Sequence, residues 1–334
     1  MARLRIAVAH GPDDAPASGP RARTRPKTDV EQIARILERA GHRVTFLLVD
    51  GSHQCLTRMA RLRTDLVFNL VESFGDDDTK EPHIAGYYEL LGLRFTGSGP
   101  RGLSLGMDKV LTKKILGFHG IKTPQFQSVF RSQVGWAHEL EFPVIVKPVR
   151  EDGSIGIGFS ALVHSIKELM ERIDELHVEF NQPVLIEQYI EGREIYVGVM
   201  GGATLEALPA VELDLSHLPK GTPRIASAEV KWQAGTRAYR GSRYRIPTDL
   251  PASVVETMQE AAITSFRALQ LRDYARVDFR LTADSAAYLI EANPNPYLHS
   301  TSEFMRGARA SGRTHARTIQ EIVELAAARY GPRV

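Results

Sequence analysis

Short apolar runs alternate with a helical pattern at the start of the chain, and this alternation limits the fold more than any other sequence feature. The runs at residues 4–9, 44–49 and 66–70 have the composition of buried strands. Between the first two, apolar residues recur at helical spacing over residues 30–40, and Gly41 follows as a helix stop. Strands that alternate with helices form a parallel sheet with helices on both faces. We therefore predict an α/β fold that begins with such a sheet.

Length, charge and cysteine content exclude several classes of protein. A chain of 334 residues is long enough for roughly two or three domains. Its 42 Lys and Arg residues nearly balance 40 Asp and Glu residues, which argues against a nucleic-acid partner. The single cysteine, Cys55, excludes an internal disulfide framework and a cysteine-based zinc site. Without an apolar run of ~18 residues or the apolar core of a secretory signal, we expect a cytoplasmic protein without a membrane partner.

The rest of the chain predicts further strands and helices, divided among three lobes. Strands are expected at residues 142–148, 184–190, 195–200, 274–281 and 286–291, and helices at residues 103–117, 252–269 and 314–328. Residues 11–28 lack such a pattern and are expected to form a long loop. Changes in composition divide the chain into lobes of residues 1–102, 103–191 and 192–334.

Two expected strands late in the chain carry charged and amide side chains at alternate positions. Because successive side chains of a strand point to opposite faces, Arg276, Asp278 and Arg280 share one face. Glu291 and Asn293 share a face in the same way. Carboxylate and amide oxygens suit Mg²⁺ when phosphates complete its coordination, and an adjacent arginine can stabilise a transferred phosphoryl group. The alternative is an ordinary hairpin whose charged residues face water.

Two groups of lysines could meet an anion. Lys147 ends an apolar strand, where a buried ammonium needs an opposite charge such as a triphosphate. Its side chain could instead extend to solvent. Lys109 lies in an expected helix close to Lys113 and Lys114, and three neighbouring lysines are more typical of a solvated face.

Two segments near Lys147 have the composition of nucleotide-binding loops. Residues 153–158 are rich in glycine, and such a loop can close over phosphates with its backbone N–H groups. The chain has neither a P-loop nor a dinucleotide-binding fingerprint, and a hairpin turn explains the same glycines. The segment from Glu187 to Ile190 could bind an adenine edge and ribose hydroxyls, or it could be a charged linker.

Taken in their order along the chain, these segments resemble the ATP-grasp superfamily and, within it, the D-alanine–D-alanine ligases. The best-matching stretches are residues 92–99, 107–113, 142–148, 276–278 and 291–293. The resemblance implies an ATP-grasp fold of mixed α/β (α+β) type, with an N-terminal Rossmann-like domain and two α+β lobes that hold ATP between them. It also implies an ATP-dependent ligase that activates a carboxylate as an acyl phosphate, which an amine attacks to form an amide.

The resemblance assigns roles to individual residues. The groups that would contact the ATP phosphates are Lys109, Lys147 and the loop residues Gly153, Ser154, Ile155 and Gly156. Those that would hold adenine and ribose are Glu187, Gln188, Tyr189, Ile190 and Glu194. Two Mg²⁺ ions, or Mn²⁺ in their place, would bind Asp278, Glu291 and Asn293. The catalytic residues would be Arg276, Lys231 and Ser154.

The expected substrate pocket departs from the D-alanine pattern. The family's Ser-x-Glu is absent after His10, and Pro294-Asn295-Pro296-Tyr297 replaces the family's Thr-Ser-Pro-Gly turn. Residues that could set a new specificity are Glu72, Arg150, Lys231, Trp232, Arg237 and Tyr297. We therefore expect small-molecule acid and amine substrates, amino acids or peptide-like compounds, with an acid other than D-alanine. A genuine D-alanine–D-alanine ligase and a non-catalytic ATP-binding regulator are the alternatives, and the resemblance alone suggests a homodimer.

Overall fold

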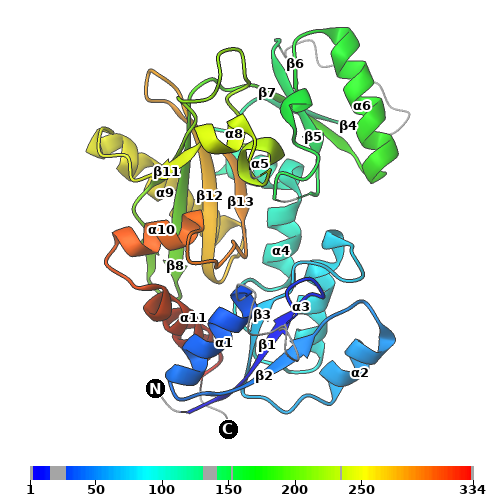
Figure 1. The fold of residues 1–334 in the computed structure, drawn as a ribbon, viewed down its shortest axis with the longest axis vertical. Helices are drawn as coiled ribbons and strands as arrows, with labels where there is room; N and C mark the ends of the chain where they lie inside the picture. The colour runs from blue at the N-terminus through cyan, green and yellow to red at the C-terminus, as the bar shows by residue number, and fades with distance from the viewer. Residues whose placement is uncertain (1–2, 16–27, 131–140, 152, 234, 332–334) are drawn as a thin grey trace.

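Three β-sheets frame the molecule in the computed structural model, which describes residues 3–15, 28–130, 141–151, 153–233 and 235–331. A three-stranded parallel sheet lies at the bottom of Figure 1, a four-stranded antiparallel sheet at the upper right, and a six-stranded antiparallel sheet between them on the left. The mixture of parallel and antiparallel sheets confirms the predicted α/β (α+β) class. The lobe boundaries at residues 102 and 191 stay a prediction.

The parallel sheet has the predicted arrangement, with helices on both faces. Its strands, in the order β2-β1-β3, are β2 (Arg43–Leu48), β1 (Arg5–His10) and β3 (Leu66–Leu70). Ile6 and Val8 point to one face and Ala7 and Ala9 to the other, as strand alternation requires. The helices that cover the first face are α1 (Asp29–Arg39), α10 (Glu303–Ala310) and α11 (His315–Tyr330), and those on the second are α2 (His53–Ala60) and α3 (Glu81–Leu90).

The four-stranded sheet buries one face and leaves the other for polar residues. Its strands, in the order β4-β7-β5-β6, are β4 (Phe126–Val129), β7 (Val184–Gln188), β5 (Val144–Pro148) and β6 (Leu162–Val163). Val144, Val146 and Ile186 pack against α6 (Ile166–Phe180) on the buried face. Because side chains alternate, Lys147 and Glu187 emerge on the opposite face.

The six-stranded sheet also buries one face against a helix and carries polar residues on the other. Its strands are β8 (Arg193–Gly201), β9 (Leu205–Ala207), β10 (Val211–Asp214), β11 (Arg243–Arg245), β12 (Asp273–Leu281) and β13 (Ala287–Asn293). Val277 and Phe279 of β12 pack against α9 (Ala252–Ala268). Arg276, Asp278 and Arg280 therefore point to the other face, which is the one turned toward the four-stranded sheet.

One predicted helix is wrong and one predicted loop is largely outside the described residues. Residues 103–117 form two helices, α4 (Pro100–Met107) and α5 (Lys109–Phe118), rather than one. The break falls at Asp108, whose carboxylate accepts hydrogen bonds from the N–H groups of Val110 and Leu111 and so caps α5. In the predicted loop at residues 11–28, residues 16–27 are not described.

The remaining short helices of the described residues are α7 (Ala228–Lys231), α8 (Arg237–Gly241) and 3₁₀ turns at Asp78–Lys80 and Phe159–Ala161.

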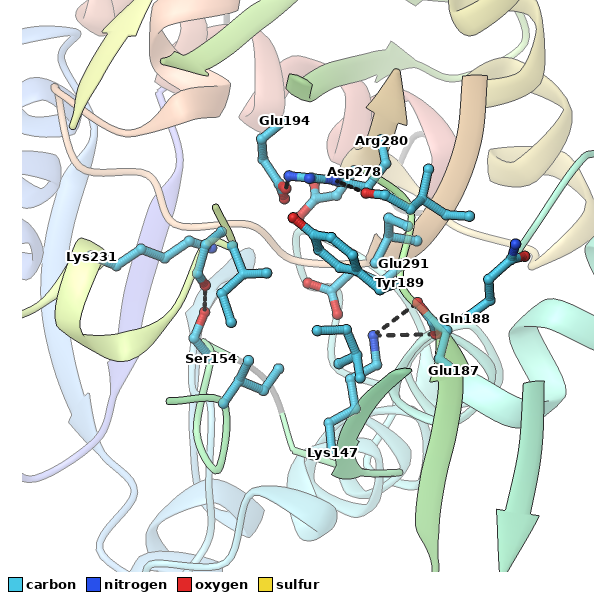
Figure 2. Close-up of a pocket in the computed structure, with 16 residues that line it drawn as sticks. Lys147, Ser154, Glu187, Gln188, Tyr189, Glu194, Lys231, Asp278, Arg280 and Glu291 are labelled. Atoms are coloured by element: carbon cyan, nitrogen blue, oxygen red, sulfur yellow. Dashed lines mark hydrogen bonds and ion pairs between the residues drawn. The ribbon is translucent and has the colours of Figure 1, made fainter. Parts of the chain in front are cut away.

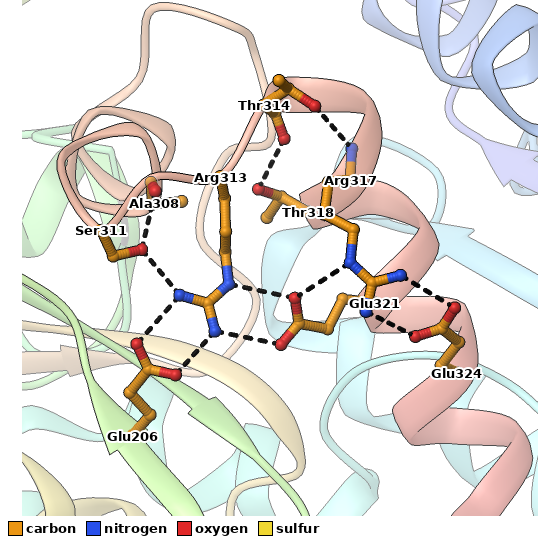
Figure 3. Close-up of polar contacts among 9 residues, drawn as sticks. All are labelled: Glu206, Ala308, Ser311, Arg313, Thr314, Arg317, Thr318, Glu321 and Glu324. Carbon is orange, nitrogen blue, oxygen red and sulfur yellow. Dashed lines mark hydrogen bonds and ion pairs between the residues drawn. The ribbon is translucent and has the colours of Figure 1, made fainter.

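Arg313, which lies just before α11, ties this helix to the six-stranded sheet (Figure 3). The Arg313 guanidinium binds both carboxylate oxygens of Glu206, at 2.9 and 2.6 Å, and both of Glu321, at 3.0 and 3.1 Å. Arg317 binds the next carboxylate along the helix, Glu324, at 3.1 and 3.0 Å. The side chain of Arg313 is 16 % exposed, against 51 % for Arg317. Arg313 therefore contributes the stronger of the two links.

Replacing Arg313 by alanine is expected to lower the free energy of unfolding by about 1–2 kcal/mol, because two carboxylates lose a charged donor. The Arg313 hydrogen bonds lower the pKa of Glu206 below its free value of 4.5. A lowered carboxylate pKa stabilises the fold above pH 4.5 and loses that effect as the pH falls through the folded value. Denaturant unfolding should therefore separate wild type from Arg313→Ala at pH 7 and bring them closer below pH 4. The control, Arg317→Ala, should change stability by less than half as much.

Candidate active site

A cavity lies between the facing sides of the four-stranded and six-stranded sheets (Figure 2). We call it the inter-sheet cavity; its empty volume is about 620 Å³. The side chains that line it come from β5, β7, β8, β12 and β13, from the loops that follow β5, β7 and β10, and from α7. The predicted site residues among them are Lys147, Ser154, Glu187, Gln188, Tyr189, Ile190, Glu194, Lys231, Asp278 and Glu291.

A buried carboxylate holds two lysines at one end of this cavity. The Glu187 Oε2 atom lies 3.1 Å from Lys113 Nζ and 3.3 Å from Lys147 Nζ, and all three side chains are less than 5 % exposed. Burial lowers the pKa of Lys113 to about 8, against the opposing effect of Glu187. Burial would raise the pKa of Glu187, but the two ammonium groups outweigh it and lower that pKa. The three groups therefore place a net positive charge at the cavity wall.

The structure decides between the alternatives for the helix lysines. Lys109 and Lys113 are 4 % and 1 % exposed, so the solvated-face interpretation is wrong for both and holds for Lys114. Lys109 Nζ lies 3.7 Å from Glu291 Oε2 and donates a hydrogen bond to the Glu151 carbonyl. Sequence reasoning missed the burial of Lys113. Its position four residues after Lys109, on the same helix face, was the available signal.

The polar residues that were predicted to share a face on β12 and on β13 lie opposite one another across the two strands. In the antiparallel register Arg276 is paired with Asn293 and Asp278 with Glu291. Arg276 donates two hydrogen bonds to Asp278, at 2.7 and 2.8 Å. Burial raises the pKa of Asp278 to about 7 against the opposing effect of Arg276. Burial would also raise the pKa of Glu291, but Lys109 and other cations lower it to about 2.

Glu303 is a site residue that sequence reasoning missed. It lies at the start of α10, far from β12 in sequence, and its Oε2 atom is 3.5 Å from Arg276 Nη1. Tyr244 donates a hydrogen bond of 2.6 Å to its other oxygen. Burial would raise the pKa of Glu303, but Arg276 and Lys231 lower it to about 2. Arg276 is therefore held between two carboxylates, with its guanidinium also 5.2 Å from the centre of the Tyr196 ring.

The residues predicted to bind metal fit a cation that also has phosphate ligands. Asn293 is buried, and its side-chain Nδ2 atom has no hydrogen-bond partner among the described residues, so the fold does not fix this amide through that atom. No cluster of three or more His, Cys, Asp or Glu side chains in the described part of the chain could hold a metal unaided. Two carboxylates and one amide form the incomplete oxygen set that Mg²⁺ takes beside a bound phosphate.

At the end of the inter-sheet cavity away from Lys147, Arg280 contacts the segment that follows β7, residues 189–194. It donates to Glu194 Oε2, as Figure 2 shows, and also to the Ile190 carbonyl; both hydrogen bonds are 2.9 Å long. Its guanidinium lies 5.7 Å from the centre of the Tyr189 ring. These contacts fix one carboxylate, one ring and a stretch of backbone around the same space. Sequence reasoning put Arg280 on the correct face without giving it a role.

The glycine-rich loop is bound to the segment that precedes and forms α7. Ser154 Oγ donates to the Ala226 carbonyl at 2.8 Å, and Trp232 Nε1 donates to the Gly153 carbonyl at 2.7 Å. The Glu229 carboxylate also accepts a hydrogen bond of 3.1 Å from the Phe159 N–H. These links close two loops, far apart in sequence, over one side of the cavity.

Three further cavities meet next to the inter-sheet cavity. The junction cavity is lined by Arg276, Asn293, Gly153, Ile155 and Lys231. The acidic cavity is lined by Asp14, Asp29 and Glu72, and it shares Glu72 and Tyr297 with the junction cavity. The outer chamber lies between residues 230–244 and residues 297–306 and shares Lys231, Trp232, Tyr297 and Glu303 with the junction cavity. Lys231 also lines the inter-sheet cavity. The junction cavity therefore borders all three of the others.

The structure separates the predicted substrate residues into two groups. Glu72, Trp232 and Tyr297 line the junction cavity. Arg150 and Arg237 line none of the four cavities: Arg150 is exposed and lies 3.5 Å from Asp108, and Arg237 is exposed at the start of α8. Gly156 also lies away from the cavity space, with a Cβ at its position meeting Pro148 at 2.9 Å. It serves the turn of the loop, where its φ is +67°.

Comparisons with known proteins show the family of this chain. Residues 115–324 match the family model described as the D-ala D-ala ligase C-terminus. A D-alanine–D-alanine ligase of Bordetella petrii is 35 % identical over 84 % of this chain and 81 % of its own length. The Sinorhizobium fredii protein described as "uncharacterized protein y4sG" is 32 % identical over 90 % of this chain and 88 % of its own.

Crystal structures of similar proteins have the same fold as this chain. The D-alanine–D-alanine ligase of Bacillus anthracis, in a crystal structure described as a complex with ATP, covers 97 % of this chain and of its own, with a TM-score of 0.74 and 22 % identity. This likeness confirms the predicted three-dimensional architecture. None of the helices in the described part of the chain has the length and apolar character needed to cross a lipid bilayer. By the family model and by its similarity to curated relatives, the chain belongs to the D-alanine–D-alanine ligase family of ATP-dependent ligases with an ATP-grasp fold.

Proposed function

We propose that this chain is an Mg-ATP-dependent ligase that joins an acid other than D-alanine to an amine. The observation that carries the proposal is the junction cavity, which contacts one cavity for each reactant. The inter-sheet cavity would hold ATP, the acidic cavity the acid substrate and the outer chamber the amine. The reacting groups would then meet beside Arg276, Asn293 and Lys231.

In this proposal, a carboxylate oxygen of the acid attacks the γ-phosphorus of ATP, and the bond to the β–γ bridging oxygen breaks to release ADP. The amine nitrogen then attacks the acyl carbon, inorganic phosphate leaves, and the nitrogen loses a proton to give the amide. Both partners of the first step are anionic, so positive charge must bring them together. Arg276 and Lys231 supply that charge beside the junction cavity, and the closed loops exclude water from the acyl phosphate.

The buried lysines at one end of the inter-sheet cavity support the nucleotide assignment. Lys109 and Lys147 would bind phosphate oxygens, and Glu187 would act mainly as the counter-ion of Lys113 and Lys147. The segment that Arg280 contacts would bind the base and ribose of ATP through Ile190 and Glu194. Asp278, Glu291 and Asn293 would hold Mg²⁺, which neutralises phosphate charge during transfer.

The acidic cavity supports an acid substrate that carries an ammonium group. Asp14, Asp29 and Glu72 border an empty volume of about 450 Å³. Burial raises the pKa of Asp14 and of Asp29, and the charge of a neighbouring aspartate adds to the rise in each case. An ammonium group bound here would favour their charged forms. An amino acid that reacts through its carboxylate keeps such a group.

The test is a screen for ADP release in which D- and L-amino acids are supplied in pairs with Mg-ATP. We expect turnover with at least one pair, loss of turnover with a chelator, and recovery on adding Mg²⁺ or Mn²⁺. D-Alanine alone should release ADP slowly or not at all. Rapid turnover with D-alanine would instead favour a genuine D-alanine–D-alanine ligase, the function that the Bordetella petrii relative's name supports. Tight ATP binding without ADP release from any pair would overturn the proposal in favour of a non-catalytic regulator.

A further inference from the structure

The outer chamber is larger than a small amine needs. Its empty volume is about 1390 Å³, which includes space open to solvent, against about 620 Å³ for the inter-sheet cavity. One wall comes from α7, α8 and β11 and the other from the loop after β13 and the start of α10. An amine that reacts in the junction cavity would project its remaining atoms into this space.

Aromatic side chains concentrate around the chamber. Trp232, Tyr239 and Tyr297 are 59 %, 42 % and 44 % exposed and all line it. They make up three of the six exposed aromatic side chains in the part of the chain that the structure describes. Exposed aromatic rings gathered around one concave surface indicate a binding site rather than ordinary surface. Rings of this kind suit an aromatic or flat apolar group.

The chamber also has an excess of positive charge. Arg243 is exposed and forms no ion pair with any described residue. Arg306 uses its Nε to bind the Thr301 carbonyl at 2.8 Å and stacks on Tyr244 at 5.1 Å, and its two terminal nitrogens have no hydrogen-bond partner among the described residues. The one acidic lining residue, Glu303, is already bound to Tyr244 and Arg276. An anionic group on the occupant would complement this charge.

The two substrate cavities therefore have opposite charge, and this difference assigns the substrates. An amino acid that reacts through its carboxylate retains an ammonium group, which suits Asp14, Asp29 and Glu72. An amino acid that reacts through its amine retains a carboxylate, which suits Arg243 and Arg306. We propose that the outer chamber binds the distal part of the amine substrate and that this substrate is an aromatic amino acid with a free carboxylate. This inference rests on the proposed function and adds the class of the second substrate.

The kinetic test compares different amine substrates, each supplied together with the acid substrate identified in the paired screen. Phenylalanine should exceed alanine, and also phenylalaninamide, which lacks the carboxylate, by about tenfold in kcat/KM. Arg306→Gln and Arg243→Gln should raise the KM for phenylalanine by about tenfold and leave that for phenylalaninamide unchanged. The matched control is Arg309→Gln: Arg309 lies on the same helix as Arg306 and binds the Ser300 carbonyl, and its side chain does not line the chamber. Equal kcat/KM values for alanine and phenylalanine, or for phenylalanine and phenylalaninamide, would overturn the inference.

A binding measurement keeps the inference separate from the ligase reaction. Trp232 lines the chamber, so phenylalanine should change its fluorescence and alanine should not. Trp232→Phe identifies the source of the signal, and Arg306→Gln should weaken the binding of phenylalanine by about tenfold. If no pair of amino acids releases ADP but this binding is seen, the proposed ligase reaction fails and the chamber assignment stands. Absence of phenylalanine binding at millimolar concentration, with turnover by other pairs, refutes the chamber assignment alone.

Discussion

Glu291→Gln is expected to reduce kcat by about a hundred- to a thousandfold without unfolding the protein. The substitution keeps the shape of the side chain and removes its charge. Glu291 stands opposite Asp278 in the β12–β13 register and 3.7 Å from Lys109, so it lies where the triphosphate and its cation would meet. Because cations lower its pKa to about 2, the wild-type side chain is charged at every ordinary assay pH.

The measurement is ADP release at saturating substrates and at increasing Mg²⁺, together with thermal unfolding. We expect the variant to need more Mg²⁺ for half-maximal rate and to unfold within a few degrees of wild type. Glu171→Gln provides the control, since Glu171 is 61 % exposed on α6 and far from the cavities. Wild-type turnover by Glu291→Gln with unchanged Mg²⁺ dependence would show that this carboxylate has no part in metal binding.

Arg276→Met is expected to lower kcat by about a thousandfold with little change in the KM for ATP. Arg276 lines the junction cavity, where phosphoryl transfer would occur, and is absent from the lining of the inter-sheet cavity. Its removal leaves Asp278 and Glu303 as buried acids without their cation. We therefore expect the free energy of unfolding to fall by about 3–5 kcal/mol as well.

Two further variants separate the catalytic effect from this loss of stability. Arg276→Lys keeps the charge but cannot donate two parallel hydrogen bonds to Asp278, so it should fold better than Arg276→Met and recover part of its activity. Arg280→Lys is the contrasting case, because Arg280 orders the expected base and ribose end of the inter-sheet cavity. It should raise the KM for ATP with a smaller effect on kcat. An Arg276→Lys enzyme that changes only the KM for ATP would contradict the assignment of Arg276 to the transferred phosphate.

Strand periodicity was enough to predict the parts of the site that depend on local geometry. The alternation that separates Val277 from Asp278 is a property of any strand, and the pairing of β12 with β13 follows from their closeness in sequence. The parallel sheet and its two helical faces follow from the same kind of pattern. The metal, phosphate and catalytic roles of these residues stay predictions until the variants are measured.

Contacts between distant segments could not be predicted in this way. Glu303 reaches Arg276 only because α10 packs beside β8, and nothing local to either residue indicates the contact. The helix break at Asp108 depended on a side-chain cap that competed with a continuous helical pattern. Arg150 has the charge of a substrate-binding residue, but its strand-end backbone directs it toward Asp108 and solvent.

The cover of the parallel sheet has a consequence for synthesis on the ribosome. Ile6, Val8 and Phe68 pack against Phe304 of α10 and Ile322 of α11, which are translated more than 200 residues later. Until those last helices emerge, the partners of this apolar surface among the described residues are α1 and the later Met200, Leu208 and Tyr274. The growing polypeptide therefore leaves part of this apolar face uncovered until its last residues are made, and exposed apolar surface of this kind promotes aggregation.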